Sequence, residues 1–195
     1  MKQYVIEGHD GSGKTPIAKG VKSLLIKHNL RVDICAPFQI ANSMIPEQDI
    51  YFYWKDPSNA KKAIGLLSGI INQCEERARK EGLDVLLYDR HWLTVLGEID
   101  HRPKLRQLWT NFQPTFFIEA PVNKTLDCKR FSFDVPWTSS IEVITDYYYK
   151  YLRLIEKYSQ YIVGRYKVES RTQPLDPIIN SITDYILLDL QLQER

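Results

Sequence analysis

The chain opens with the apolar run Tyr4–Glu7, followed at once by the stretch Gly8-His9-Asp10-Gly11-Ser12-Gly13-Lys14-Thr15. This stretch matches the pattern G-x-x-x-x-G-K-[ST]. The residues that follow, Thr15–Asn29, have the apolar spacing of a helix. A strand, a glycine-rich loop and a helix in this order are the context in which the pattern binds nucleotide phosphates. The opening of the chain therefore predicts both a fold class and a ligand.

Each residue type in this loop has a chemical reason. Gly8, Gly11 and Gly13 let the backbone turn tightly and approach an anion closely. The backbone N–H groups of the loop and of the helix N-terminus then point at the phosphates. Lys14 supplies positive charge to the β- and γ-oxygens, and the Thr15 hydroxyl is a ligand for Mg²⁺. We therefore expect all of residues 8–15 to bind ATP.

Two further expectations concern side chains within the loop. Lys14 is expected to be exposed and to pack against nothing. His9 is expected to face solvent or substrate.

A carboxylate follows each of two other apolar runs. Asp89 comes after Val85–Tyr88, and Glu119 ends the run that begins at Phe116. Acidic residues at the carboxyl ends of parallel strands face the same crevice as the phosphate loop. We expect Asp89 to hold Mg²⁺ together with Thr15, and Arg90 to neutralise an acceptor phosphate. A structural role is favoured for Glu119.

Short apolar runs alternate with longer helical patterns along the chain, which predicts a parallel sheet. The expected strands are Tyr4–Glu7, Arg31–Ala36, Asp84–Tyr88, Thr115–Glu119 and Tyr161–Glu169. The expected helices are Thr15–Asn29, Ser58–Glu81, Ser139–Tyr161 and Pro177–Leu188. The fold class expected is α/β, a three-layer doubly wound parallel sheet with helices on both faces. Residues 1–195 are interpreted as a single domain, with a mobile loop at 37–57 and a short lid near 131–140.

The composition is that of an ordinary globular protein, with 44% hydrophobic and 26% charged residues. The net charge of +2 favours neither a nucleic-acid surface nor a membrane surface. No apolar run approaches the ~18 residues of a membrane helix. The three cysteines, Cys35, Cys74 and Cys128, are far apart and form no C-x-x-C pair. Free thiols in a reducing compartment are expected, which favours a cytoplasmic location.

Two motifs resemble those of the thymidylate kinase family of nucleoside monophosphate kinases. Residues 7–15 are similar to that family's E-G-x-D-G-x-G-K-[ST] loop. Asp89-Arg90-His91, with Thr94 five residues after the aspartate, resembles its D-R-[YW]-x-x-S motif. The strand Thr115–Glu119, followed by the basic pair Lys129-Arg130, is a third and weaker resemblance to that family. Together these cover roughly the first 130 residues in the expected order.

The resemblance implies phosphoryl transfer from ATP, with Mg²⁺, to a nucleoside monophosphate. By that resemblance Asp10 contacts the sugar 3′-hydroxyl of the acceptor, and Lys14 acts on the donor phosphates. Asp89 and Arg90 meet the acceptor phosphate and its magnesium shell. Arg130, or Lys129 beside it, contacts the donor nucleotide. The catalytic set so implied is Lys14, Asp89, Arg90 and Asp10.

The acceptor side departs from that family. The arginine that usually follows the second strand is absent from Cys35–Phe38, and the arginine of the long helix is absent from Leu67–Ile70. A kinase acting on a hydroxyl, of a nucleoside or of a hydroxymethyl pyrimidine that is free or in DNA, therefore stays open. Such an acceptor needs a carboxylate base, and Asp10 or Asp89 could serve. Glu47 and Asp49 lie farther after the second strand than the carboxylate base of such a kinase usually does.

A nucleotide-dependent switch is the third alternative. Asn123-Lys124 begins a guanine-recognition pattern, but Leu126 stands in its fourth position. The expected partner is therefore a small nucleotide or nucleoside, with DNA as acceptor only in the second alternative. No membrane partner is expected, and a homodimer stays open.

Overall fold

The runs predicted as strands form five strands, and the central ones are buried on both faces of the sheet, so they need no polar alternation. The computed structural model describes residues 1–195 except 46–49, 55, 123–140, 171 and 193–195. Its strands are β1 (Lys2–Gly8), β2 (Val32–Cys35), β3 (Val85–Asp89), β4 (Thr115–Glu119) and β5 (Ile162–Lys167). They form one sheet in the order β2-β3-β1-β4-β5. Every neighbouring pair is parallel, so the predicted fold class, with P-loop NTPase-like topology, is confirmed.

Helices connect the strands, as parallel neighbours require. The longer ones are α1 (Lys14–Lys27), α4 (Pro57–Lys80), α8 (Ile141–Lys157) and α9 (Asp176–Gln191). The shorter ones are α2 (Pro37–Met44), α3 (Ile50–Tyr53), α5 (Trp92–Ile99), α6 (Pro103–Arg106) and the 3₁₀ turn η2 (Ser159–Tyr161). Among the described helices, none is long and apolar enough to cross a membrane.

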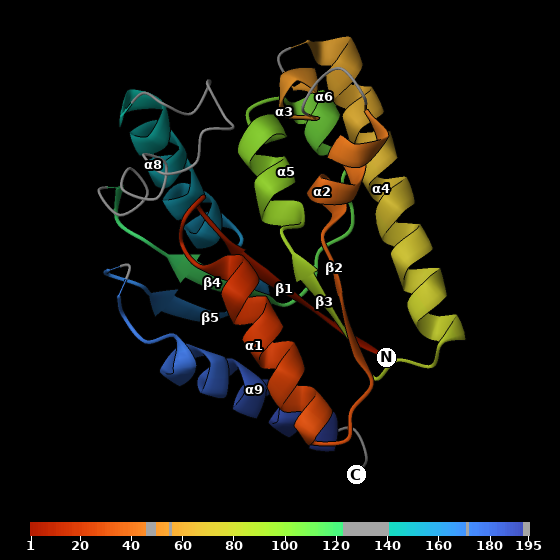
Figure 1. Ribbon diagram of the computed structural model, residues 1–195. Helices are drawn as coiled ribbons and strands as arrows, with labels where there is room; N and C mark the ends of the chain where they lie inside the picture. Colours follow the sequence, from red (N-terminus) through yellow and green to blue (C-terminus); the bar gives the residue numbers. More distant parts are fainter. Residues whose placement is uncertain (46–49, 55, 123–140, 171, 193–195) are drawn as a thin grey trace.

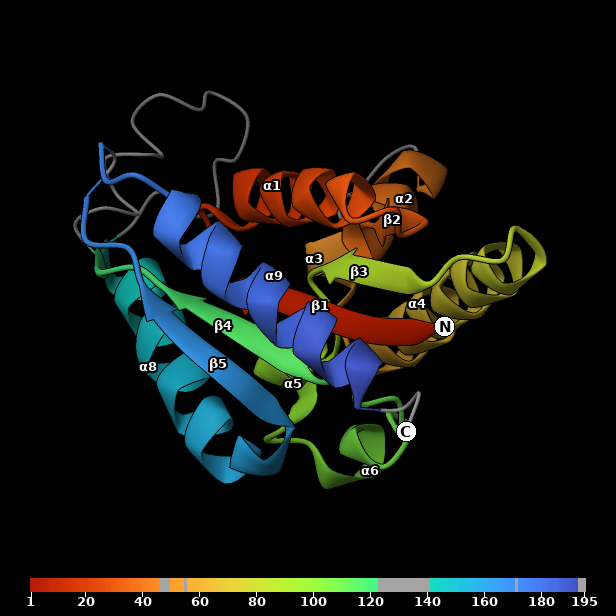
Figure 2. The same cartoon turned by 90° about the horizontal axis from the view of Figure 1, so that it is seen from below.

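The helices cover both faces of the sheet. Figures 1 and 2 show α1 and α9 on one face, with α4, α5 and α8 on the other. Alternation along β1 supplies both cores: Val5 packs under α4 and α5, whereas Tyr4 and Ile6 pack under α1 and α9. Each such fully buried side chain contributes about 1.5–3 kcal/mol. Because the strands are parallel, their carboxyl ends lie together at one edge of the sheet.

The segment 37–57, predicted as a mobile loop, is largely helical where it is described. Pro37 begins α2 at the position where its missing N–H is harmless. Phe38 and Ala41 are buried in the core that α2 shares with α4. The Asn42 side chain accepts a hydrogen bond from the Ile50 N–H (2.9 Å), which ties α2 to α3. In residues 37–45 and 50–54, two short helices packed against the core stand where a loop was expected.

Candidate active site

The loop between β1 and α1 has the backbone that an anion cradle requires. Gly8 has a φ of 151°, and a side chain there would overlap the carbonyl oxygen of Ile118. Gly13 begins α1 in the left-handed region, at φ 96°, and no side chain caps the helix. No side chain therefore caps the N–H groups of Lys14 and Thr15 in the first turn, and such groups can bind an anion. Ser12 adds a buried hydroxyl with no hydrogen-bond partner among the described residues. The cradle fits a phosphate group.

Lys14 is buried, with 6% of its surface exposed, so the expectation of an exposed side chain is wrong. Its ammonium folds back into the loop and donates to the carbonyl of His9 (2.5 Å). Burial, and then the charge of Arg90, lowers the pKa of Lys14 to about 8, against the opposing pull of Asp10, Asp89 and Glu7. A bound phosphate would restore the charged form. Lys14 therefore places its ammonium group inside the phosphate loop.

Thr15 and Asp89, the two residues predicted to hold magnesium, are brought together. The Thr15 hydroxyl donates to an Asp89 carboxylate oxygen at 2.5 Å. The pairing follows from the sheet, because Asp89 ends β3 beside Ile6 of β1. Among the described residues, no group of three or more His, Cys, Asp or Glu side chains forms a metal site. A hydroxyl and a carboxylate nevertheless fit Mg²⁺, which keeps several waters and takes oxygens from substrate phosphates.

Arg90 adopts an unusual backbone conformation, with a φ of 71° in the left-handed region. Its N–H donates to the Ile6 carbonyl (3.2 Å), so the turn after β3 is tied to β1. Its guanidinium forms an ion pair with Asp10 and reaches the Thr94 hydroxyl at 3.4 Å. The Asp10 side chain remains half exposed. The structure therefore brings the predicted residues Lys14, Asp89, Arg90 and Asp10 to one edge.

Glu7 is a site residue that sequence reasoning passed over except as part of a motif. It is fully buried, and its carboxylate accepts from the His91 N–H (2.7 Å), the Thr94 N–H (3.0 Å) and the Thr94 hydroxyl (2.9 Å). A buried carboxylate is tolerated only when it is hydrogen-bonded in this way. The negative charge also suits the N-terminus of α5. Glu7 thereby fixes the turn that carries Asp89 and Arg90. An acidic residue inside an apolar strand was the available signal.

His9 does not face solvent, contrary to expectation. Only 5% of it is exposed, and its ring stacks on Tyr148 with centroids 5.2 Å apart and lies 4.8 Å from the ring of Tyr151. Both tyrosines belong to α8. The aromatic contacts therefore close the loop on the side away from β3.

Glu119 at the end of β4 is occupied by structural partners. One carboxylate oxygen accepts from the Tyr148 hydroxyl (2.9 Å), and the other accepts from the guanidinium of Arg165 (2.8 Å). These bonds join β4, α8 and β5. The arrangement agrees with the structural role favoured for Glu119.

Several predictions fall outside the described residues. These are Arg130 and Lys129 for the donor nucleotide, the lid near 131–140, Glu47, Asp49, Cys128 and the Asn123-Lys124 pair.

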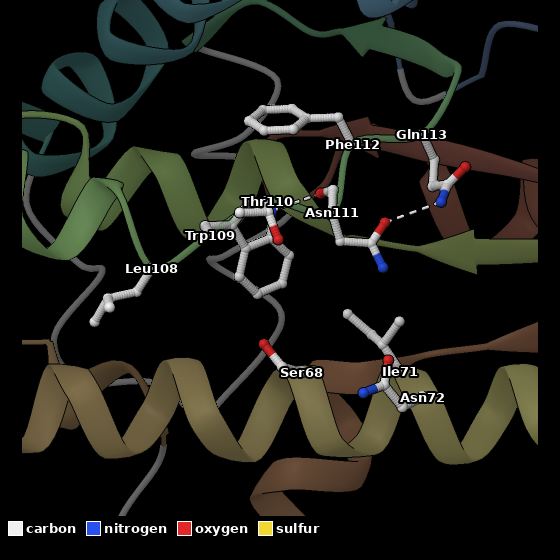
Figure 3. Close-up of a pocket in the computed structure, with 9 residues that line it drawn as sticks. All are labelled: Ser68, Ile71, Asn72, Leu108, Trp109, Thr110, Asn111, Phe112 and Gln113. Carbon is white, nitrogen blue, oxygen red and sulfur yellow. Dashed lines mark hydrogen bonds between the residues drawn. The ribbon is translucent and has the colours of Figure 1, made fainter.

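A cavity of about 490 Å³ lies between α4 and the segment before β4 (Figure 3). Its lining residues are all uncharged: Ser68, Ile71, Asn72, Leu108, Trp109, Thr110, Asn111, Phe112 and Gln113. Gln113 stands two residues before Thr115, the first residue of β4, whereas the phosphate loop lies at the carboxyl ends of the strands. The cavity therefore does not form part of the phosphate cradle.

No protein-family model matches this sequence, and no curated protein matches it. The likeness to the thymidylate kinase family therefore rests on the two motifs and their order. The sheet establishes the coarser class, an α/β fold compatible with P-loop NTPases.

Proposed function

We propose that this protein transfers the γ-phosphoryl group of ATP to a (deoxy)nucleoside monophosphate, with Mg²⁺ as the required cation. The observation that carries the proposal is the meeting of Lys14, the Thr15–Asp89 pair and Arg90 where β1 adjoins β3. A cradle for a triphosphate, oxygen ligands for a hard cation and a second fixed cation are the parts that phosphoryl transfer uses.

In the proposed reaction, an oxygen of the acceptor phosphate attacks the γ-phosphorus of ATP. The new P–O bond forms as the bond to the β–γ bridging oxygen breaks, and ADP leaves with that electron pair. Loop amides and Lys14 hold the donor phosphates throughout. Thr15 and Asp89 would hold the magnesium ion, whose charge offsets that of the phosphate oxygens. Arg90 offers its guanidinium to the acceptor phosphate once Asp10 releases it.

A hydroxyl acceptor is the second candidate, favoured by two observations. The Asp10 carboxylate is half exposed at the mouth of the loop, where a general base for a sugar or hydroxymethyl group would stand. In addition, Leu67–Ile70, in the middle of α4, carries no cationic side chain that could meet an acceptor phosphate.

One comparison separates the two candidates. The same base is offered as a nucleoside and as its 5′-monophosphate, with γ-labelled ATP and Mg²⁺, and labelled product is separated and counted. The proposal expects label on the monophosphate only. Label on the nucleoside or on hydroxymethylated DNA, with none on any monophosphate, would transfer the assignment to a hydroxyl kinase.

A further inference from the structure

Two thiols meet at the end of β2, outside the phosphate loop itself. Cys35 is the last residue of β2, and Cys74 lies on α4, which packs beside β2 (Figure 1). Their Sγ atoms are 2.8 Å apart, although the two residues are separated by 39 positions in the chain. Both are free cysteines, and both are buried in the core beneath α4. A disulfide bond has an S–S length of about 2.05 Å, so closure needs under about 1 Å of movement.

The two thiols are chemically unequal. A hydrogen bond from the Cys35 thiol, with the charge of Arg77, lowers the pKa of the Cys74 thiol to about 7, although burial opposes this. The same hydrogen bond and burial raise the pKa of Cys35. Cys74 also keeps 8% of its surface exposed, against 1% for Cys35. Because the thiolate is the reactive form, Cys74 is the sulfur that meets a small oxidant first.

We propose that Cys35 and Cys74 are an oxidisable dithiol, which hydrogen peroxide converts into an intramolecular disulfide between β2 and α4. The Cys74 thiolate attacks the peroxide oxygen, the O–O bond breaks, and the departing hydroxide takes up a proton to leave as water. The sulfenic acid so formed is attacked by the Cys35 sulfur. The S–S bond forms as the S–O bond breaks, and a second water leaves. Two thiols lose two electrons, which the peroxide gains.

The bridge would lie beside the proposed active site. Cys35 pairs in the sheet with Tyr88, the residue before Asp89. The Tyr88 hydroxyl in turn approaches Glu75, the neighbour of Cys74 on α4, at 3.5 Å. A disulfide here would pin the end of β2, from which α2 departs, to the long helix. Sensitivity of the acceptor side to peroxide follows only if the proposed function holds, whereas the bridge itself does not depend on it.

The test is made on the full-length protein with Cys128→Ser as the background, so that the pair supplies all the thiols. The folded protein is treated with hydrogen peroxide, quenched, denatured and titrated for free thiols. We expect both thiols to be lost, the intact mass to fall by two hydrogens, and a non-reduced digest to contain one peptide linking residues 35 and 74. Dithiothreitol should reverse all three changes. Closing a 39-residue separation should also raise the Tm of the oxidised protein.

Single-thiol variants serve as controls. Cys35→Ser should leave a sulfenic acid at Cys74 that dimedone traps, whereas Cys74→Ser should react far more slowly. If a serine variant fails to fold, the alanine variant replaces it, and the digest of the Cys128→Ser protein needs no further variant. Two titratable thiols after a peroxide dose that fully oxidises free cysteine would overturn the proposal. Bridges formed only between chains would overturn it equally.

Discussion

The two flanks of the phosphate loop are built from different chemistry. On the β3 flank, carboxylates and cations meet: Glu7 holds the turn, Thr15 bonds to Asp89, and Arg90 pairs with Asp10. On the β4 flank, the ring of His9 stacks on that of Tyr148 of α8, and Glu119 is held by Tyr148 and Arg165. The β3 flank thus gathers the charged groups of the proposed site, whereas the β4 flank supports the loop through ring packing and structural hydrogen bonds. Substitutions on the two flanks should therefore affect turnover and stability differently.

The largest effect is expected at the centre of the loop. Lys14→Ala removes the buried cation that we propose meets the β- and γ-phosphates, so kcat should fall on the order of 10³-fold. The measurement is transfer of label from γ-labelled ATP. Lys19→Ala, an exposed lysine on the same helix, is the matched control and should keep full activity. Near-normal turnover of Lys14→Ala would remove phosphoryl transfer from consideration.

Asp89→Asn should come next. The amide keeps the size of the side chain but weakens its hold on the cation, so kcat should fall on the order of 10²-fold. ATP affinity should change less. Excess chelator should abolish the wild-type activity, and Mg²⁺ or Mn²⁺ should restore it. A variant with unchanged kcat, or wild-type activity that survives chelation, would refute the metal role of this flank.

Glu7→Gln and Glu119→Gln compare the two flanks directly. Each replaces a buried carboxylate, and each should destabilise the fold by about 1–3 kcal/mol in chemical unfolding. Only Glu7→Gln should also lower kcat, by about 10-fold, because the turn bearing Asp89 and Arg90 loses its anchor. Equal kcat losses in the two variants would show that the flanks do not differ as described.

A pH profile gives the smallest effect. Lys14 has a lowered pKa of about 8 in the free protein, so it loses its charge as pH rises through that value. ATP affinity should be steady below pH 8 and fall above it by up to about tenfold for each pH unit. The pKa of Lys14 is also lower in the folded protein than in the unfolded chain. The contribution of Lys14 to the free energy of unfolding therefore rises as pH increases above 8. The Lys14→Ala variant should lack the affinity step. If ATP affinity fell above pH 8 in that variant too, a group other than Lys14 would be responsible for the pH dependence.

The residues of the loop and the alternation of runs were enough to predict the sheet, and β4 has the predicted bounds. The helix α5 went unpredicted because nearly all of its side chains are buried, which leaves no polar face to mark a helical period. The burial of Lys14 and His9 was also missed. It depends on α8 and on the turn after β3, which lie far away in sequence. Motif spacing thus identified which residues meet, while tertiary packing decided how they are held.

Isothermal titration of ATP into the protein, with and without Mg²⁺, tests the proposed phosphate and metal site without needing an acceptor. We predict that ATP binds and that Mg²⁺ strengthens the binding. We also predict affinity weaker by about tenfold or more in Lys14→Ala, and loss of the magnesium effect in Thr15→Val. Glu119→Gln should bind as the wild type does. Absence of ATP binding, or equal affinity in all four proteins with and without Mg²⁺, would contradict the assignment of the β1–β3 corner as the phosphate and metal site.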